Sequence, residues 1–274
     1  MDLRRRLCVI YSDGGAETDY SVEAQDFKRD TFNITMTTDD FIYVGFYKSI
    51  NALYAQLVTA NTNTSSLTME YFTDQSVWST LEISDDTRAF SRSGFITWTR
   101  PDDAANTTVA GKELCWVRIS SNDDLTVASF QALNLLFSDD NDICADTPDL
   151  IDDCFYPSGQ TSHVLNHLAA KNYIMGRLRS LGYVKTGANG EENITEWDVL
   201  DVYELRLAST YYAISQIYFN LSDNVDDQYW IKYQSYTQRF EEAFNLGVLS
   251  IDTNDNGQID LNERRPVQSI RWYK

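Results

Sequence analysis

The chain has 274 residues, of which 43% are hydrophobic and 13% are aromatic, and this composition excludes a globally disordered protein. Its formal net charge of -19 argues against a broad face for duplex DNA, because phosphate binding requires a cationic surface. A chain of this length forms one large domain or two medium ones.

The charge is unevenly distributed along the chain. Residues 120–155 contain nine Asp and neither Lys nor Arg, whereas the ends are basic, with Arg4-Arg5-Arg6 near the start. An acidic body with basic ends favours head-to-tail binding between copies, and simple solvation of the ends is the alternative. The four cysteines form no CxxC pair, which favours reduced thiols, and pairing of Cys144 with Cys154 is left open. We find no apolar stretch long enough to span a membrane.

Residues 31–138 alternate β-branched and aromatic residues with polar ones, a pattern typical of strands. In Leu67–Phe72, for example, Leu67, Met69 and Tyr71 share one face. Eight short strands of this kind predict an antiparallel β-sandwich of jelly-roll-like order. Residues 1–30 are more polar, and we assign them to an N-terminal arm. The expected strands are 32–37, 41–47, 53–59, 67–72, 78–83, 95–99, 114–120 and 132–137.

The Asp-rich segment 139–160 is a predicted linker, after which the hydrophobic period changes from 2 to 3.6 residues. Residues 161–250 therefore predict a helical bundle, and the whole chain an α+β protein of two domains. Thr195 and Asp198 have the spacing of a capping box and predict the start of a long helix. That helix is apolar on two sides, so it is central in its bundle or lies between subunits. The other expected helices are 162–181 and 226–246, and the loop 185–193 is expected to be mobile.

Residues 251–263 contain a twelve-residue segment with the spacing of an EF-hand calcium loop. Gly257 occupies the sixth position, where the chain must turn sharply. No second loop follows, and Pro266 disfavours a long exiting helix, so we predict a structural calcium ion rather than a sensor. A metal-free Asp/Asn/Gly turn is the alternative. The predicted ligands are Asp252, Asn254, Asn256, Gln258 (through its backbone carbonyl), Asp260 and Glu263.

The last eleven residues, 264–274, are basic and aromatic, and we expect them to dock on a partner. Val267, Ile270 and Trp272 are expected to pair as a short strand with a neighbouring molecule. A frayed terminus is the alternative. The predicted docking residues are Arg264, Arg265, Val267, Ile270, Arg271, Trp272 and Lys274.

The sequence contains no recognisable catalytic motif. His163 and His167 lie four residues apart, but no HExxH glutamate or third ligand accompanies them, which favours a half-buried helical pair over a zinc site. Trp78, Trp98 and Trp116 would stack on sugars if exposed, but their strand positions favour the core. Adjacent acidic pairs such as Asp85-Asp86 would make a glycosidase if they lay at a cleft, but in a chain this acidic they are typical of solvated turns. We therefore expect no enzymatic activity.

Several segments resemble the head-to-tail adaptor (connector, or neck) proteins of tailed bacteriophages. In the helical half these are Thr195–Asp198, Tyr203–Ala208, the aromatic third helix, the Asp252–Glu263 loop and Arg271-Trp272. The β half is similar to a domain of phage virion proteins, through Phe41–Gly45, Leu67–Phe72, Ser93–Trp98 and Phe137–Asp142. Residues 1–30 and 185–192 fall outside the resemblance.

The resemblance implies a structural, non-enzymatic virion protein, assembled in the bacterial host cytoplasm and located in the neck of the particle. It implies a homo-oligomeric ring, a dodecamer, between the portal protein and the tail or next neck protein, around DNA that passes without sequence specificity. The β domain would project outward to fibre, collar or capsid partners. The competing hypothesis is a calcium-stabilised, carbohydrate-binding β-sandwich module.

Overall fold

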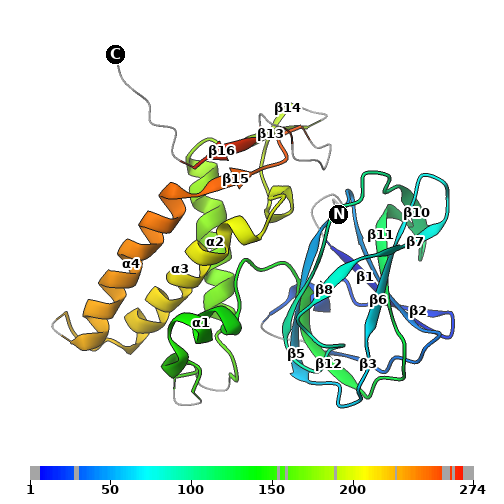
Figure 1. Ribbon diagram of the computed structural model, residues 1–274, viewed down its shortest axis with the longest axis horizontal. Helices are drawn as coiled ribbons and strands as arrows, with labels where there is room; N and C mark the ends of the chain where they lie inside the picture. Colours follow the sequence, from blue (N-terminus) through cyan, green and yellow to red (C-terminus); the bar gives the residue numbers. More distant parts are fainter. Residues whose placement is uncertain are drawn as a thin grey trace. The chain divides into compact units, whose positions relative to one another are not determined.

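The structure is a computed structural model that describes residues 7–27, 31–152, 155–157, 160–187, 190–225, 227–254, 260 and 263–267. The chain divides into two compact units, Met1–Leu135 and Leu136–Lys274 (Figure 1). Antiparallel sheets build the first unit, and helices with two short hairpins build the second. The expected combination of antiparallel β-structure with a following helical region is confirmed at this level.

The first unit contains a seven-stranded and a five-stranded sheet, which lie face to face in Figure 1. The larger sheet has the order β2-β1-β4-β11-β6-β7, and β10 pairs with β11 beside this path. Its strands are β1 (Cys8–Asp13), β2 (Ala16–Asp19), β4 (Phe41–Phe46), β6 (Leu67–Phe72), β7 (Trp78–Leu81), β10 (Asn106–Val109) and β11 (Lys112–Ser121). The smaller sheet has the order β3-β12-β5-β9-β8, with β3 (Phe32–Ile34), β5 (Ala52–Thr59), β8 (Ile83–Asp85), β9 (Gly94–Trp98) and β12 (Ala128–Asn134).

The core of this unit follows from the two-residue period of its strands. On β4 and β11, Ile42, Val44 and Ile119 are fully buried, whereas the alternate residues Tyr43 and Arg118 are only half-buried on the opposite face. The register pairs Ile42 with Ile119 and Tyr43 with Arg118, so each face is continuous across neighbouring strands. Burial of the first set holds the two sheets together.

The predicted N-terminal arm differs from what the structure shows. Residues 8–19 form β1 and β2, and Ile10 of β1 pairs with Tyr43 of β4 inside the larger sheet. Val9 and Ile10 are both fully buried, so both faces of β1 are covered. A strand buried on both faces lacks polar alternation, which is the signal that the prediction relied on.

The second unit has four α-helices within its described residues. The long helix α3 contacts both α2 and α4 as well as α1, and its residues Ala213, Ile214 and Ile217 are buried in a shared core with Ala170 of α2 and Tyr236 of α4. This helix was expected to be central in its bundle or to lie between subunits, and the first alternative explains why most of its apolar residues are buried. The helices are α1 (Asp140–Asp146), α2 (Val164–Ser180), α3 (Tyr203–Leu221) and α4 (Gln228–Leu246).

Three segments of this unit depart from the expected boundaries. The predicted linker contains α1, whose capping box joins Asp139 and Asp142. The capping box of Thr195 and Asp198 is present, but it begins the short 3-10 turn η4 (Glu196–Asp198) rather than α3. The predicted mobile loop forms the hairpin of β13 (Val184–Gly187) and β14 (Gly190–Asn193). Among the described helices, none combines the length and apolar character needed to cross a bilayer.

Candidate functional site

The predicted calcium loop is held closed at its base. It follows the strand β15 (Val248–Ser250), which pairs with β16 (Arg264–Pro266) on the far side of the loop. The backbone N–H of Ile251 donates to the carbonyl oxygen of Glu263 at 3.2 Å, which continues this pairing into the loop. The first and last positions of the loop therefore lie side by side before any ligand is considered.

The carboxylate of Glu263 lies inside the loop rather than in solvent, since the residue is only 3% exposed. Its Oε1 accepts hydrogen bonds from the backbone N–H groups of Thr253 (2.6 Å) and Asn254 (3.1 Å) and from the Thr253 hydroxyl (2.9 Å). Its Oε2 accepts from the N–H of Asp260 at 3.4 Å. The residue predicted as the bidentate ligand thus organises the loop backbone around one carboxylate.

Four of the six predicted ligands lie within the described residues. Asn254 Nδ2 donates to Asp260 Oδ2 at 2.8 Å, which brings loop positions 3 and 9 together, and Asp252 is fully buried. Asn256 and Gln258 lie outside the described residues. In the part of the chain that the structure describes, no group of three or more His, Cys, Asp or Glu side chains is arranged to hold a metal ion. The structure therefore brings Asn254, Asp260 and Glu263 together but shows no complete ligand set.

A buried ion pair supports the base of the loop. Lys185 of β13 and Asp198 of η4 are both buried, and Lys185 Nζ lies 3.2 Å from Asp198 Oδ1. The other carboxylate oxygen of Asp198 accepts from the N–H and hydroxyl of Thr195, and its backbone carbonyl accepts from the N–H of Asp252 at 2.8 Å. The loop thus begins at a point fixed by the capping box that the sequence predicted.

The predicted docking residues separate into two groups. Arg264 and Arg265 are exposed on β16. Val267 is buried, and its N–H donates to the carbonyl of Gly247 at 3.0 Å, so it packs within its own chain rather than on a neighbour. Ile270, Arg271, Trp272 and Lys274 lie outside the described residues. A cavity of about 610 Å³ borders β16 and the loop, lined among others by Tyr183, Thr253, Glu263 and Arg265.

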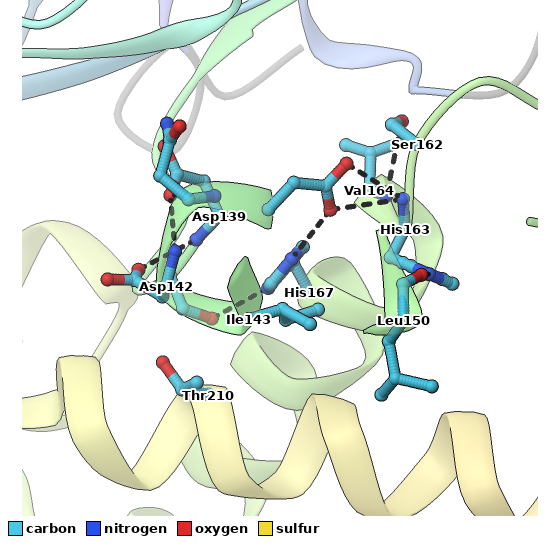
Figure 2. A network of polar contacts seen from close by, with 12 residues as sticks. Asp139, Asp142, Ile143, Leu150, Ser162, His163, Val164, His167 and Thr210 are labelled. Carbon is cyan, nitrogen blue, oxygen red and sulfur yellow. Dashed lines mark hydrogen bonds and ion pairs between the residues drawn. The ribbon is translucent and has the colours of Figure 1, made fainter. Parts of the chain in front are cut away.

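The two histidines belong to a buried polar network rather than to an open site (Figure 2). His167 Nδ1 lies 2.8 Å from Ser138 Oγ, and His167 Nε2 lies 3.1 Å from Asp140 Oδ1. Ser138 Oγ lies 2.7 Å from Ser209 Oγ on α3. Ser138, His167 and Asp140 are linked in the order found in a Ser-His-Asp catalytic triad. Ser138 is fully buried, however, so its hydroxyl is not accessible to a substrate.

The same network joins the start of α2 to the preceding segments. Asp140 also accepts from the backbone N–H of His163, and His163 Nε2 lies 2.9 Å from the carbonyl oxygen of Leu150 (Figure 2). Burial lowers the pKa of His163, which favours the neutral ring as a donor to that carbonyl. The network links α1, α2 and α3 through hydrogen bonds, and this is a structural role.

A second cluster, which sequence reasoning missed, lies on the face of the larger sheet that points away from the smaller one. We name it the Arg118 cluster. Arg118 lies over the rings of Phe41 and Trp78 and pairs with Glu70, with 2.7 Å between Arg118 Nε and Glu70 Oε2. The available signal was that aromatic residues occupy strand positions where alternation expects polar ones. The cluster consists of Phe41, Tyr43, Glu70, Phe72, Trp78 and Arg118.

Of the three tryptophans considered for sugar stacking, Trp98 and Trp116 are in the core, as expected from their strand positions. Trp78 is half-buried in the Arg118 cluster. The ring of Trp116 lies against Gly45, and its Nε1 donates to the carbonyl of Thr107 on β10 at 3.0 Å. Strand β10 therefore covers the part of this face of the larger sheet that carries Trp116, and the Arg118 cluster lies at the other end of the same face.

Comparison with known proteins identifies no family. No protein-family model matches the chain, and no curated protein matches it. Among solved structures, a chitosan-binding module of a chitosanase/glucanase from Paenibacillus sp. IK-5 is 17% identical, with a TM-score of 0.30, over 48% of this chain and 94% of that one.

Two further structures show similarly weak likeness. A CBM32 module of AlyQ in complex with 4,5-unsaturated mannuronic acid is 10% identical, with a TM-score of 0.25, over 38% of this chain and 74% of that one. A family 89 glycoside hydrolase from Clostridium perfringens is 9% identical, with a TM-score of 0.30, over 65% of this chain, which spans only 20% of that protein. At TM-scores this low the likeness carries no weight for fold or function.

Proposed function

We propose that the chain is a structural head-to-tail adaptor of a tailed phage, which forms a ring between portal and tail around the DNA channel. One observation carries the proposal. Large apolar side chains remain exposed on the α3–α4 hairpin although its core is filled: Phe219 is 47%, Val225 is 63% and Ile231 is 62% exposed. Exposed apolar residues gathered on one element are typical of surfaces that another protein covers.

The hairpin's end also carries aromatic rings in mutual contact. Ring centroids of Phe219 and Tyr233 lie 5.3 Å apart, and those of Trp230 and Tyr233 lie 5.1 Å apart. Such rings offer a large contact area at a low cost in conformational entropy, and aromatic residues are enriched where proteins associate. Tyr203 and Leu207, 48% and 56% exposed near the start of α3, are further exposed apolar side chains on this helix.

In this proposal the two units are separate domains. The helical domain supplies the ring contacts, and the jelly-roll-like β domain holds outer partners such as fibre, collar or capsid proteins. The acidic surface suits a channel that lets DNA pass, because a net charge of -19 disfavours adhesion to phosphates. In this proposal the basic segment that begins with the exposed Arg264 docks on the portal or on a neighbouring copy.

Calcium would hold the EF-hand-like loop in this proposal, with Asp252, Asn254, Asp260 and Glu263 as the described ligands. The donor set suits the ion, since all four residues offer hard oxygen atoms and Glu263 already faces the loop interior. The ion would supply positive charge against these carboxylates. Its effect would be mechanical, because it would fix the segment between β15 and β16.

The ring proposal is tested with matched charge substitutions in the full chain. Ile231→Glu places a charge on the exposed face of α4, and Val58→Glu does the same on β5, where Val58 is also 62% exposed. We expect Ile231→Glu to abolish ring formation in negative-stain images and Val58→Glu to leave it intact. Equal effects of both variants, or no rings in any sample, would count against the proposal.

A further inference from the structure

The Arg118 cluster has an unusual composition for the solvent side of a sheet. The register aligns Tyr43 of β4, Arg118 of β11 and Glu70 of β6 in one row, and it aligns Phe72 of β6 with Trp78 of β7 in the next. Polar residues are expected on such a face, because it does not contribute to the core between the sheets. All of these side chains are half-buried, and Tyr43 and Trp78 pack against a buried apolar cluster on the same face that includes Trp116.

The guanidinium of Arg118 is held in one orientation by its neighbours. Its Cζ lies 4.6 Å from the ring centroid of Phe41 and 4.5 Å from that of Trp78, within the range of cation–π attraction. Its Nε donates to Glu70 at 2.7 Å. Two rings and one ion pair therefore immobilise a side chain that is otherwise among the most flexible in proteins.

The outer end of this guanidinium is available to a ligand. Within the described residues, the only hydrogen bond of Arg118 is made through Nε, and its Nη groups are not among the buried atoms that lack a partner. The side chain is 21% exposed, so the Nη groups face solvent. A fixed guanidinium presents its terminal N–H groups in the geometry that a carboxylate accepts.

We propose that the Arg118 cluster binds an acidic saccharide, with the sugar carboxylate on the Nη groups of Arg118 and a sugar ring against the aromatic side chains. The complementarity lies in hydrogen bonding, because Glu70 occupies only Nε of Arg118 and leaves the paired Nη donors for a carboxylate. The half-buried rings of Tyr43 and Trp78 supply apolar contact to a pyranose ring.

Two features favour a saccharide over an acidic protein segment. Glu70 places a carboxylate beside Arg118 that accepts hydrogen bonds from sugar hydroxyls, whereas an acidic side chain offers no hydroxyl donor to it. The surface is also small, with one guanidinium and four rings, whereas a stable protein interface buries roughly 800 Å² on each partner. The proposal concerns the first unit alone and does not depend on the neck assignment.

The test measures binding of the full chain to trimers of galacturonate, mannuronate and glucuronate by isothermal titration calorimetry. Each trimer is paired with its methyl ester, which keeps the ring and removes the charge. We expect saturable binding to at least one acidic trimer and at least tenfold weaker binding to its ester. Binding to none of the acidic trimers, or equal binding to acid and ester, would overturn the proposal.

Variants assign the binding to Arg118. We expect Arg118→Lys, which keeps the charge but loses the planar set of donors, to weaken binding about tenfold, and Arg118→Gln to abolish it. Lys112→Gln removes the same charge from the same sheet outside the cluster and is expected to bind as the unchanged protein does. Equal affinity of Arg118→Lys would overturn the proposal, as would tighter binding of a poly-glutamate peptide than of any trimer, which would assign the surface to a protein.

Discussion

The ammonium group of Lys171 lies 3.2 Å from the carboxylate of Glu196, and this pair joins the middle of α2 to the turn η4 that precedes α3. Lys171 is only 4% exposed, whereas Glu196 reaches solvent with 26% of its side chain. Burial raises the pKa of Glu196, but the charge of Lys171 and the hydrogen bonds around the carboxylate more than offset it, so that the pKa lies below its ordinary value.

Removal of one partner of this pair leaves a poorly solvated charge. We expect Lys171→Met to lower the free energy of unfolding by about 3 kcal/mol, the low end for a broken buried pair because Glu196 is partly solvated. Urea unfolding at neutral pH measures it. The double change Lys171→Met with Glu196→Leu is expected to restore part of the loss, and a double variant less stable than the single one would contradict this account.

Asp40 stabilises the first unit in its ionised form. Burial raises the pKa of Asp40. The hydrogen bonds that its carboxylate accepts have the larger opposite effect, so the net pKa lies below the ordinary 3.8. The donors are the N–H groups of Thr37 and Gly14, at 2.7 and 2.8 Å, and the hydroxyls of Thr37 and Tyr11. Because the folded pKa is the lower one, this stabilisation is present above pH 3.8 and is lost as the pH falls through the folded value.

The consequence is a pH-dependent effect of one substitution. We expect Asp40→Asn to cost about 1–3 kcal/mol at neutral pH, because an amide nitrogen cannot accept these hydrogen bonds. The difference from the unchanged protein should shrink when urea unfolding is repeated at about pH 2. Asp39→Asn, next to it but exposed, is the control and should show little change. A constant difference at both pH values would contradict the ionised role of Asp40.

Substitution of glycine by alanine is expected to have opposite effects on stability at Gly45 and at Gly176. A Cβ at Gly45 would lie 2.4 Å from the ring of Trp116, whereas a Cβ at Gly176 on α2 meets nothing within 4 Å. We expect Gly45→Ala to destabilise the protein by about 1–3 kcal/mol through overpacking. Gly176→Ala should stabilise it by about 0.5–1 kcal/mol, because alanine is the better helix former. Thermal unfolding measures both, and a tolerated alanine at position 45 would show that the Trp116 ring does not lie where described.

If the loop binds calcium, the free energy of unfolding depends on the calcium concentration. If the loop binds the ion, addition of calcium to 100 times its dissociation constant raises the free energy of unfolding by about 2.7 kcal/mol, and chelation reverses the gain. Because Glu263 also accepts N–H groups of the loop, Glu263→Gln lowers stability even without the ion.

The informative quantity is therefore the increment on calcium addition, measured by thermal unfolding. It should vanish in Glu263→Gln and persist in Glu242→Gln, where the glutamate is exposed on α4. An increment absent from the unchanged protein, together with no calcium by elemental analysis, would refute the calcium proposal.

Strand β6 shows how alternation along the sequence marks a strand. The segment Leu67–Phe72 forms β6 with the expected bounds, because its alternation reports directly on burial. β1 was missed because Val9 and Ile10 are both buried. β10 was missed because Asn106–Val109 is mostly polar, and its conformation is fixed by pairing with β11 rather than by its own residues.

The start of α3 shows a tertiary contact that overrides a local signal. The capping box at Thr195 is present, yet the following residues do not continue as a helix, because Val199 forms a bridge with Ile251 and the N–H of Leu200 donates to the carbonyl of Ser250 at 2.8 Å. These residues extend the small sheet beside β15. Sequence periodicity cannot reveal this competition, since the partner lies some fifty residues further along the chain.

The candidate sites were predictable to different degrees. The calcium loop stays a prediction from spacing, and the structure adds that its ends lie together and that Glu263 accepts N–H groups of Thr253 and Asn254. The Arg118 cluster was unpredictable from spacing, because its members come from four strands whose order follows from the register of the whole sheet.

The most direct test of the neck assignment is the molar mass of the full chain in solution, measured by light scattering alone and after mixing with a portal ring purified from the same virus. The account predicts a closed ring whose mass is a whole multiple of the 31.4 kDa chain, formed by itself or on the portal. A particle of 31.4 kDa at every concentration, unchanged by the portal, would contradict it.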